Sequence, residues 1–185
     1  MSTVNHSTSR TAVSAMNTLL LVASLGFSVS ALGAEDGVAT PEAFVTPEAF
    51  VAQASQHGKT GVALSNLALK KSQSPQVQEF ARRMVTLNRE TTAGLSAIAR
   101  ARGIEIPEGL DSIHAARVSA VDTEVGASFD YVYTRHMSAD HSRTVAMFEE
   151  AANSQDVELA QFARKILPAL KAERATVRKL VRAAR

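Results

Sequence analysis

The chain has 185 residues, a length typical of one well-packed domain with a short additional segment. It contains no cysteine, which excludes disulfides, thiolate metal ligands, a cysteine nucleophile and a lipid-modified amino-terminal cysteine. Hydrophobic residues make up 45% of the chain but aromatic residues only 5%, and the net charge is +2, so the composition favours close-packed helices over sheets and the charge identifies no partner.

The first 34 residues have the order of a secretory signal peptide. Their only charged side chain is Arg10, and an apolar stretch from Ala12 to Leu32 follows it. Serine and glycine residues interrupt this stretch, which disfavours a membrane-spanning helix of about 20 apolar residues. We therefore predict an exported protein of the periplasm or cell envelope, whose mature chain begins near Glu35. The candidate cleavage sites follow Ala31, Gly33 and Ala34.

A hexapeptide, Thr-Pro-Glu-Ala-Phe-Val, occurs twice in tandem, at Thr40–Val45 and Thr46–Val51. Each copy has the features of a helix start, with threonine as N-cap, proline at the first helical position and glutamate in the first turn. We expect Thr46 to be the N-cap and the upstream copy to be an extension or an alternative first turn. The predicted organisation is a signal peptide at 1–34, an extension containing the duplicated hexapeptide at 35–46, and a helical domain at 47–184.

Apolar residues recur at helical spacing through the rest of the chain and predict four long helices joined by short connections. Proline follows a capping residue at Ser74, and Gly103 is a helix stop. A short extra helix is expected between the second and third long helices. These patterns predict an all-α, up-down four-helix bundle. The predicted helices lie at about 47–71, 75–102, 111–121, 128–152 and 156–184.

Polar residues interrupt the predicted inward faces on three of the long helices. They are Asn88 in the second helix, Asp140 and His141 in the third, and Glu173 in the fourth. A buried carboxylate or imidazole is costly unless it is paired, protonated or metal-bound. One hypothesis is therefore a metal site for iron, zinc or manganese, made by His141 and Glu173 with Asp140 or Asn88 assisting. The other is a hydrogen-bonded polar layer that fixes the register of the helices.

The remaining histidines of the helical region, His57, His114 and His136, are interpreted as ordinary surface or rim residues. The chain shows no Ser-His-Asp set, glycine-rich phosphate loop, paired-histidine zinc motif or dinucleotide fingerprint. These patterns do not predict an enzyme.

The last predicted helix carries a basic stripe opposite its apolar face. Such a stripe fits contact with anionic lipid, or a solvated face at a helix C-terminus, where the dipole favours cations. Nucleic acid is disfavoured as a partner because no aromatic residues alternate with the basic ones. The stripe consists of Lys171, Arg174, Arg178, Arg182 and Arg185.

Several stretches together resemble the domain of unknown function 4142 family, which comprises exported bacterial proteins with a ferritin-like four-helix bundle. The resemblance covers about Pro47 to Leu180 and implies that fold for this chain. The matching stretches are Phe50–Gly58, Leu64–Lys71, Ser74–Val85, Phe129–Tyr133, Ala139–His141 and Phe162–Leu170.

The family pattern places an Asp-His pair in the second helix, another in the third, a histidine in the fourth and an acid in the first. Only Asp140-His141 matches it fully. Asn88 stands in place of the first histidine, Glu173 in place of the last, and Gly61 in place of the acid. If these family positions ligate a metal, this chain has lost part of that site.

The leading prediction is thus an exported, non-catalytic binding or structural module of the cell envelope without a cofactor, associated through its family with stress. Its partner would be an envelope protein or a small ligand. The alternative is a divergent ferritin-like protein that binds a divalent or iron ion through His141 and Glu173. A further alternative is a peripheral binder of anionic membranes or polyanions through the basic stripe. The sequence specifies neither the ligand nor the oligomeric state.

Overall fold

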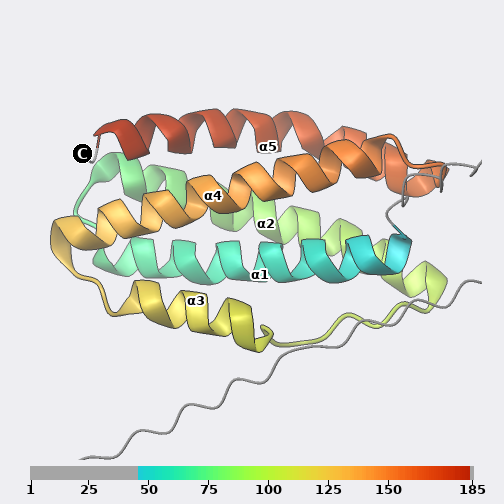
Figure 1. The fold of residues 1–185 in the computed structure, drawn as a ribbon, viewed down its shortest axis with the longest axis horizontal. Helices are drawn as coiled ribbons and strands as arrows, with labels where there is room; N and C mark the ends of the chain where they lie inside the picture. Colours follow the sequence, from blue (N-terminus) through green and yellow to red (C-terminus); the bar gives the residue numbers. More distant parts are fainter. Residues whose placement is uncertain (1–45, 184–185) are drawn as a thin grey trace, which may run out of the picture. The chain divides into compact units, whose positions relative to one another are not determined.

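A computed structural model of the protein describes residues 46–183. This range is all-α, contains no strand, and confirms the predicted long helices and the short extra helix (Figure 1). The first hexapeptide copy and the expected signal peptide lie outside the described residues. The helices are α1 (Pro47–Lys71), α2 (Pro75–Arg102), α3 (Ser112–Asp122), α4 (Gly126–Ala152) and α5 (Val157–Ala183).

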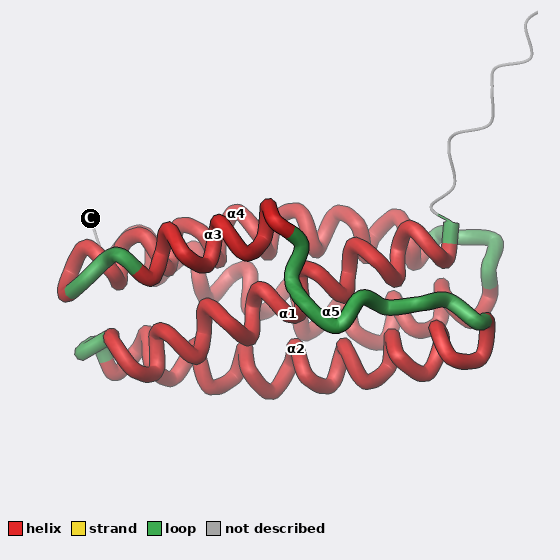
Figure 2. The backbone as a smooth tube through the Cα atoms, turned by 90° about the horizontal axis from the view of Figure 1, so that it is seen from below, coloured by secondary structure: helices red, strands yellow, loops and turns green. Residues whose placement is uncertain are grey.

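The four long helices pack around a shared interior. Helix α1 contacts α2 and α4, and α5 contacts the same two helices from the other side. The short α3 lies beside α1 and has a smaller interface with α4. Figures 1 and 2 show the arrangement of the helices. Helix α3 buries only Val121 completely, so it covers part of α1 and α4 rather than contributing a full face to the core.

The helix starts follow the capping signals in the sequence. Thr46 Oγ1 accepts a hydrogen bond from the backbone N–H of Ala49 at 3.2 Å, which confirms Thr46 as the N-cap of α1. Ser74 Oγ accepts the N–H of Val77 at 3.4 Å at the start of α2. Helix α4 begins at Gly126, two residues before the predicted start near Ser128.

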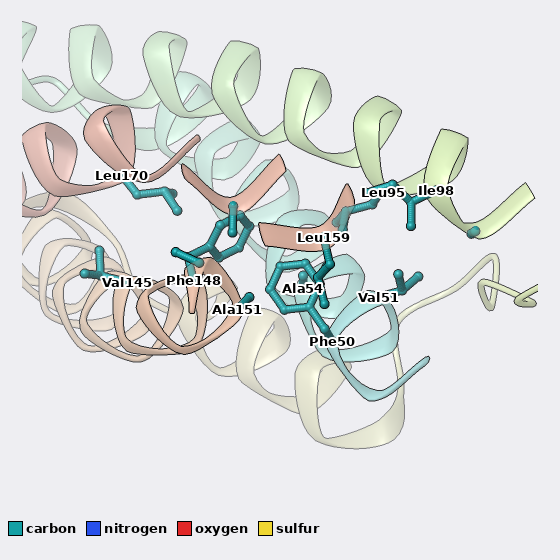
Figure 3. Close-up of a cluster of buried hydrophobic side chains, with 13 residues drawn as sticks. Phe50, Val51, Ala54, Leu95, Ile98, Val145, Phe148, Ala151, Leu159 and Leu170 are labelled. Atoms are coloured by element: carbon teal, nitrogen blue, oxygen red, sulfur yellow. The ribbon is translucent and has the colours of Figure 1, made fainter. Parts of the chain in front are cut away.

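The apolar interior consists of two clusters, one toward each end of the four long helices. The first, shown in Figure 3, contains Phe50 and Phe148 in edge-to-face contact with ring centres 5.0 Å apart, together with Leu95 and Leu159. The second contains the buried rings of Phe80, Phe129 and Tyr133 with Leu64 and Met84. Nearly all of the residues predicted to face inward are buried or half-buried.

Gly103 ends α2 in the left-handed conformation, with φ of 67°. We expect Gly103→Ala to lower the free energy of unfolding by about 1 kcal/mol, because an alanine is strained in that conformation. Gly109 is the matched control, since it has no such φ and a Cβ there would meet open space. Urea denaturation checks both variants, and an equal effect of the two substitutions would refute the conformational argument.

Candidate functional site

A layer of polar residues separates the two apolar clusters at mid-length of the helices. In each long helix, the residues between those of the first cluster and those of the second include polar side chains. The four polar residues that the sequence places on inward faces, Asn88, Asp140, His141 and Glu173, belong to this layer. The buried polar residues of this layer are Ser55, Gln56 and Thr60 of α1, Thr91 of α2, and Asp140, His141 and Thr144 of α4.

The predicted metal ligands His141 and Glu173 have separate partners within this layer. Glu173 forms an ion pair with Arg83 of α2, with Nε and Oε1 2.8 Å apart. The ring of His141 is 4% exposed, lies 6.1 Å from the ring centre of Phe80, and bonds through Nδ1 to the carbonyl of Met137 at 3.0 Å. A metal ion at these two residues would have to compete with Arg83 for the carboxylate.

Asn88 lies on α2 against α1. Its Nδ2 donates to the carbonyl of Met84 at 2.9 Å, and a Cβ added at Gly61 would lie 2.5 Å from the same nitrogen. Gly61 and Asn88 are two of the positions at which, by the resemblance described above, the chain departs from the family pattern; Glu173 is another. The structure brings Gly61 and Asn88 into contact, and the amide of Asn88 occupies the space that a side chain at residue 61 would need.

Asp140 of α4 links three helices through its carboxylate. Its Oδ1 lies 2.7 Å from Nδ1 of His57 on α1 and 3.9 Å from Nη1 of Arg117 on α3. The Asp140 side chain is 7% exposed and that of His57 is 16% exposed. Nη1 of Arg117 is buried and has no hydrogen-bond partner among residues 46–183. The carboxylate of α4 is thus the electrostatic link between α1 and α3.

The environment of Asp140 favours its ionised form. Burial alone would raise the pKa of this carboxyl, but the hydrogen bond from His57 and the nearby positive charges outweigh burial, so the pKa lies below its usual value. A carboxylate accepts hydrogen bonds but cannot donate them, so the proton of the short bond is carried by Nδ1 of His57.

A second histidine and carboxylate lie next to this pair. His114 of α3 bonds through Nδ1 to Asp111 at 2.8 Å, and its ring is almost perpendicular to that of His57, with ring centres 5.5 Å apart. Both imidazoles line a hollow of about 300 Å³ between α1 and the start of α3. The hollow is lined by Ala52, Gln53, Gln56, His57, Pro107, Asp111 and His114.

Gln56 positions this hollow by fastening the loop before α3 onto α1. Its side-chain amide donates to the carbonyl of Gly109 at 3.1 Å and accepts the N–H of Asp111 at 3.0 Å. Asp111 also caps α3 by accepting the N–H of His114 at 2.8 Å. The same few residues therefore fix the loop, the helix start and the second imidazole.

The polar layer supplies histidines and carboxylates, but it does not gather them into a large ligand set. In residues 46–183, no group of three or more His, Asp or Glu side chains has an arrangement that would hold a metal ion. The predicted metal site of Asp140, His141, Glu173 and Asn88 stays a prediction, with its members directed to different partners.

His141 makes stability depend on pH. Its burial lowers the pKa of the imidazole, more than the charges of Asp140 and Glu173 raise it, so the native state favours the neutral ring. The unfolded chain takes up this proton near pH 6.5, so stability is lost as the pH falls through that value. Half-buried His136 adds to the loss, because burial and nearby arginines also lower its pKa.

We therefore expect the free energy of unfolding to decrease between pH 7.5 and pH 5.5, and His141→Gln to reduce that decrease. Urea denaturation of both proteins at the two pH values measures it. His136→Gln is the control variant and should remove a smaller part of the decrease, since His136 is less buried. An unchanged pH dependence in His141→Gln would contradict the assignment.

The basic stripe is partly paired. Lys171 forms an ion pair with Glu149 at 2.8 Å, while Arg178 and Arg182 are exposed. Arg185 lies outside the described residues. None of the helices at 46–183 is both long and apolar enough to cross a membrane. Contact of the stripe with anionic lipid stays a prediction.

Sequence reasoning missed His57, His114 and Arg117 as members of a site. It treated the two histidines as ordinary surface or rim residues, whereas each is mostly shielded and bonded to a carboxylate. The available signal was weak: His57 lies next to the inward face of α1, and His114 lies three residues after the capping Asp111. Only the packing of α3 on α1 brings them together.

Solved structures similar to this chain share its helical fold. A DUF305 fragment from Deinococcus radiodurans is 22% identical, with a TM-score of 0.65 over 73% of this chain and 94% of the other. CopM in its Cu(II)-bound form is 17% identical, with a TM-score of 0.62 over 74% and 96% of the two chains. A DUF305 protein of Streptomyces coelicolor, described as secreted, is 14% identical, with a TM-score of 0.64 over 77% and 94%.

These identities are low, so the similarities establish the fold alone. No curated protein matches the chain. The model of a domain of unknown function, DUF4142, matches residues 33–180 and thus includes every helix described above except the end of α5. The resemblance inferred from the helix motifs is confirmed, and the chain belongs to the DUF4142 family.

Proposed function

We propose that this protein is an exported, non-catalytic binding module of the cell envelope, built as an up-down, ferritin-like four-helix bundle. Its binding site is the junction of α1, α3 and α4. Export is supported by the signal-like first 34 residues and by the similar fold of a DUF305 protein that is described as secreted. The domain limits proposed from the sequence, 1–34, 35–46 and 47–184, belong to the same proposal.

The observation that carries the proposal is the buried Asp140–His57 pair beside a hollow of about 300 Å³. A concave site with a few convergent polar groups and a carboxyl of shifted pKa is the usual form of a small-ligand site. The residues lining the hollow include amides, imidazoles and a carboxylate but no serine or cysteine nucleophile. This chemistry supports binding rather than covalent catalysis.

A thermal-shift panel tests the proposal with named probes: CuCl2, ZnCl2, phosphate, acetate, glutamate and spermidine. We expect at least one probe to raise the Tm of the full chain by more than about 2 °C, which corresponds to a ligand well above its Kd. His57→Gln should remove that shift. Asp122→Asn, a substitution at an exposed α3 carboxylate, should leave it unchanged. If no shift depends on His57, the junction is not a binding site.

The second candidate function is metal binding at His141 and Glu173, with Asp140 or Asn88 assisting. It is favoured by the copper- and silver-bound forms of CopM, which share the fold. Elemental analysis of unchelated protein tests it. Near-stoichiometric metal that His141→Ala abolishes, while His57→Gln retains it, would support this candidate over the junction site.

A further inference from the structure

The two imidazoles at the junction line the same hollow, and each is bonded to a carboxylate through Nδ1. We infer that the hollow between α1 and the start of α3 takes one Cu²⁺ ion, bound by Nε2 of His57 and Nε2 of His114. This inference rests on the proposed function of the junction and names its ligand class. The ion would lie outside the core, away from His141 and Glu173.

Hydrogen bonds to carboxylates fix the orientation of both rings. Nδ1 of His57 bonds to Asp140 at 2.7 Å, and Nδ1 of His114 bonds to Asp111 at 2.8 Å. Since both acceptors are carboxylates, each neutral ring carries its proton on Nδ1 and has a lone pair on Nε2. Metal-binding histidines usually have this carboxylate partner, which fixes the tautomer and increases the basicity of the ligand. Neither Nε2 makes a hydrogen bond within residues 46–183.

The spacing of the rings is close to that of two ligands of one ion. Metal–nitrogen bonds of about 2.0–2.1 Å place the centres of two neighbouring imidazoles roughly 4.5 Å apart on a tetragonal ion and roughly 5 Å apart on a tetrahedral one. The observed separation is 5.5 Å, and both rings line the same hollow. The two rings come from different helices, and Gln56 holds the loop before α3 on α1, so the spacing is set by the fold.

The ligands available in the hollow favour Cu²⁺. The described residues offer no third His, Asp or Glu to this pair, so water or an amide oxygen would complete the coordination. Imidazole with oxygen ligands suits Cu²⁺ in a tetragonal geometry, and Cu²⁺ binds nitrogen and oxygen ligands more tightly than Zn²⁺. The hollow has space for several water molecules beside the ion.

Copper titration of the full chain tests the inference. The protein is untagged, stripped with EDTA, and carries His6→Gln, which removes a histidine outside the described residues. Calorimetry with CuCl2 at pH 7, in the presence of glycine as a weak competitor, should give one site that binds Cu²⁺ at least tenfold more tightly than Zn²⁺. Electron paramagnetic resonance should show nitrogen coupling from two imidazoles.

Variants of single residues locate the ion. His57→Gln and His114→Gln should each weaken Cu²⁺ binding at least tenfold, and His136→Gln, the matched control, should leave it within about twofold. Asp111→Asn keeps a capping side chain at the start of α3 but removes the charge behind His114, so it should weaken binding about tenfold while circular dichroism stays unchanged.

Three results would overturn the inference: no Cu²⁺ site, a site that survives His57→Gln and His114→Gln, or a site lost only in His141→Gln. If copper does not bind but another probe of the thermal-shift panel depends on His57, the copper inference fails and the proposed binding function stands. If no probe depends on His57, both fail.

Discussion

Asp140→Ala is expected to lower the free energy of unfolding by about 3 kcal/mol at pH 7. The substitution leaves His57 without its acceptor and removes the carboxylate nearest to the buried Nη1 of Arg117. Removing one partner of a buried pair is strongly destabilising, because the other partner stays desolvated. Chemical denaturation at pH 7, followed by far-ultraviolet circular dichroism, measures the change.

The matched control for this variant is Asp122→Ala. Asp122 is the last residue of α3 and forms an ion pair with Lys71 of α1 at 2.6 Å. Its side chain is 53% exposed, unlike that of Asp140. We expect a change of about 0.5 kcal/mol or less there, since exposed ion pairs contribute little. Equal effects of the two substitutions would show that burial of Asp140 does not determine its contribution.

The effect of Asp140→Ala on the free energy of unfolding should depend on pH. Because the pKa of Asp140 is lowered in the native state, its stabilisation is present above the unfolded value of about 3.9 and is lost as the pH falls below it. The difference between wild type and Asp140→Ala should therefore shrink when the two are compared at pH 3. A double-mutant cycle with His57→Ala should give a coupling energy that shrinks in parallel.

Phe148→Ala is expected to lower the free energy of unfolding by about 4 kcal/mol. Phe148 is 1% exposed, and its ring centre lies 5.0 Å from that of Phe50 (Figure 3). It also lies 6.1 Å from the ring centre of Phe162. Its loss removes buried apolar area and leaves a cavity that the rigid helices cannot fill completely. Urea denaturation measures the effect.

Val157→Ala at the start of α5 is the control for this core substitution. Val157 is 68% exposed, so its truncation should change the free energy of unfolding by less than about 0.5 kcal/mol. A loss below about 2 kcal/mol in Phe148→Ala would mean that the first apolar cluster rearranges to fill the space. Phe50→Ala would then be expected to show a similarly small effect, because both rings share that cluster.

The helices could be predicted from the sequence because their signals are local. Thr46 with its following proline, Ser74 with Pro75, and the left-handed Gly103 each act within a few residues of the helix end that they define. The inward faces follow from helical spacing alone, so the burial of Phe80, Tyr133 or Phe148 needs no knowledge of tertiary contacts.

The site could be predicted only in part, because its partners are distant in the chain. Asp140 was recognised as an inward polar residue, but its partner His57 is 83 residues away. Helix α3 has a weak apolar face, so no periodic signal indicates that Arg117 faces α4 or that His114 faces α1. The pairing of Asp140 with His57 depends on how α4 packs on α1, and the positions of Arg117 and His114 depend on how α3 packs on both.

Three positions that depart from the pattern implied by the family resemblance have partners that only the structure shows. Gly61 and Asn88 lie against each other between α1 and α2, and Glu173 is neutralised by Arg83 across α2 and α5. An acid at residue 61 would not fit beside Asn88 without movement. Residues 61 and 88 therefore constrain each other directly, whereas Glu173 is paired separately with Arg83.

Helix α3 is expected to exchange its backbone amides faster than the long helices. It has 11 residues and buries only Val121 completely, so it is too short to persist alone and depends on its contacts with α1 and α4. Segments held in this way open locally before the whole protein unfolds, and their backbone amides exchange with deuterium faster than those of the core. The exchange rate of residues 112–122 therefore reports directly on the junction: any ligand that bridges His57 and His114 will slow exchange there and leave the amides of α5 unaffected.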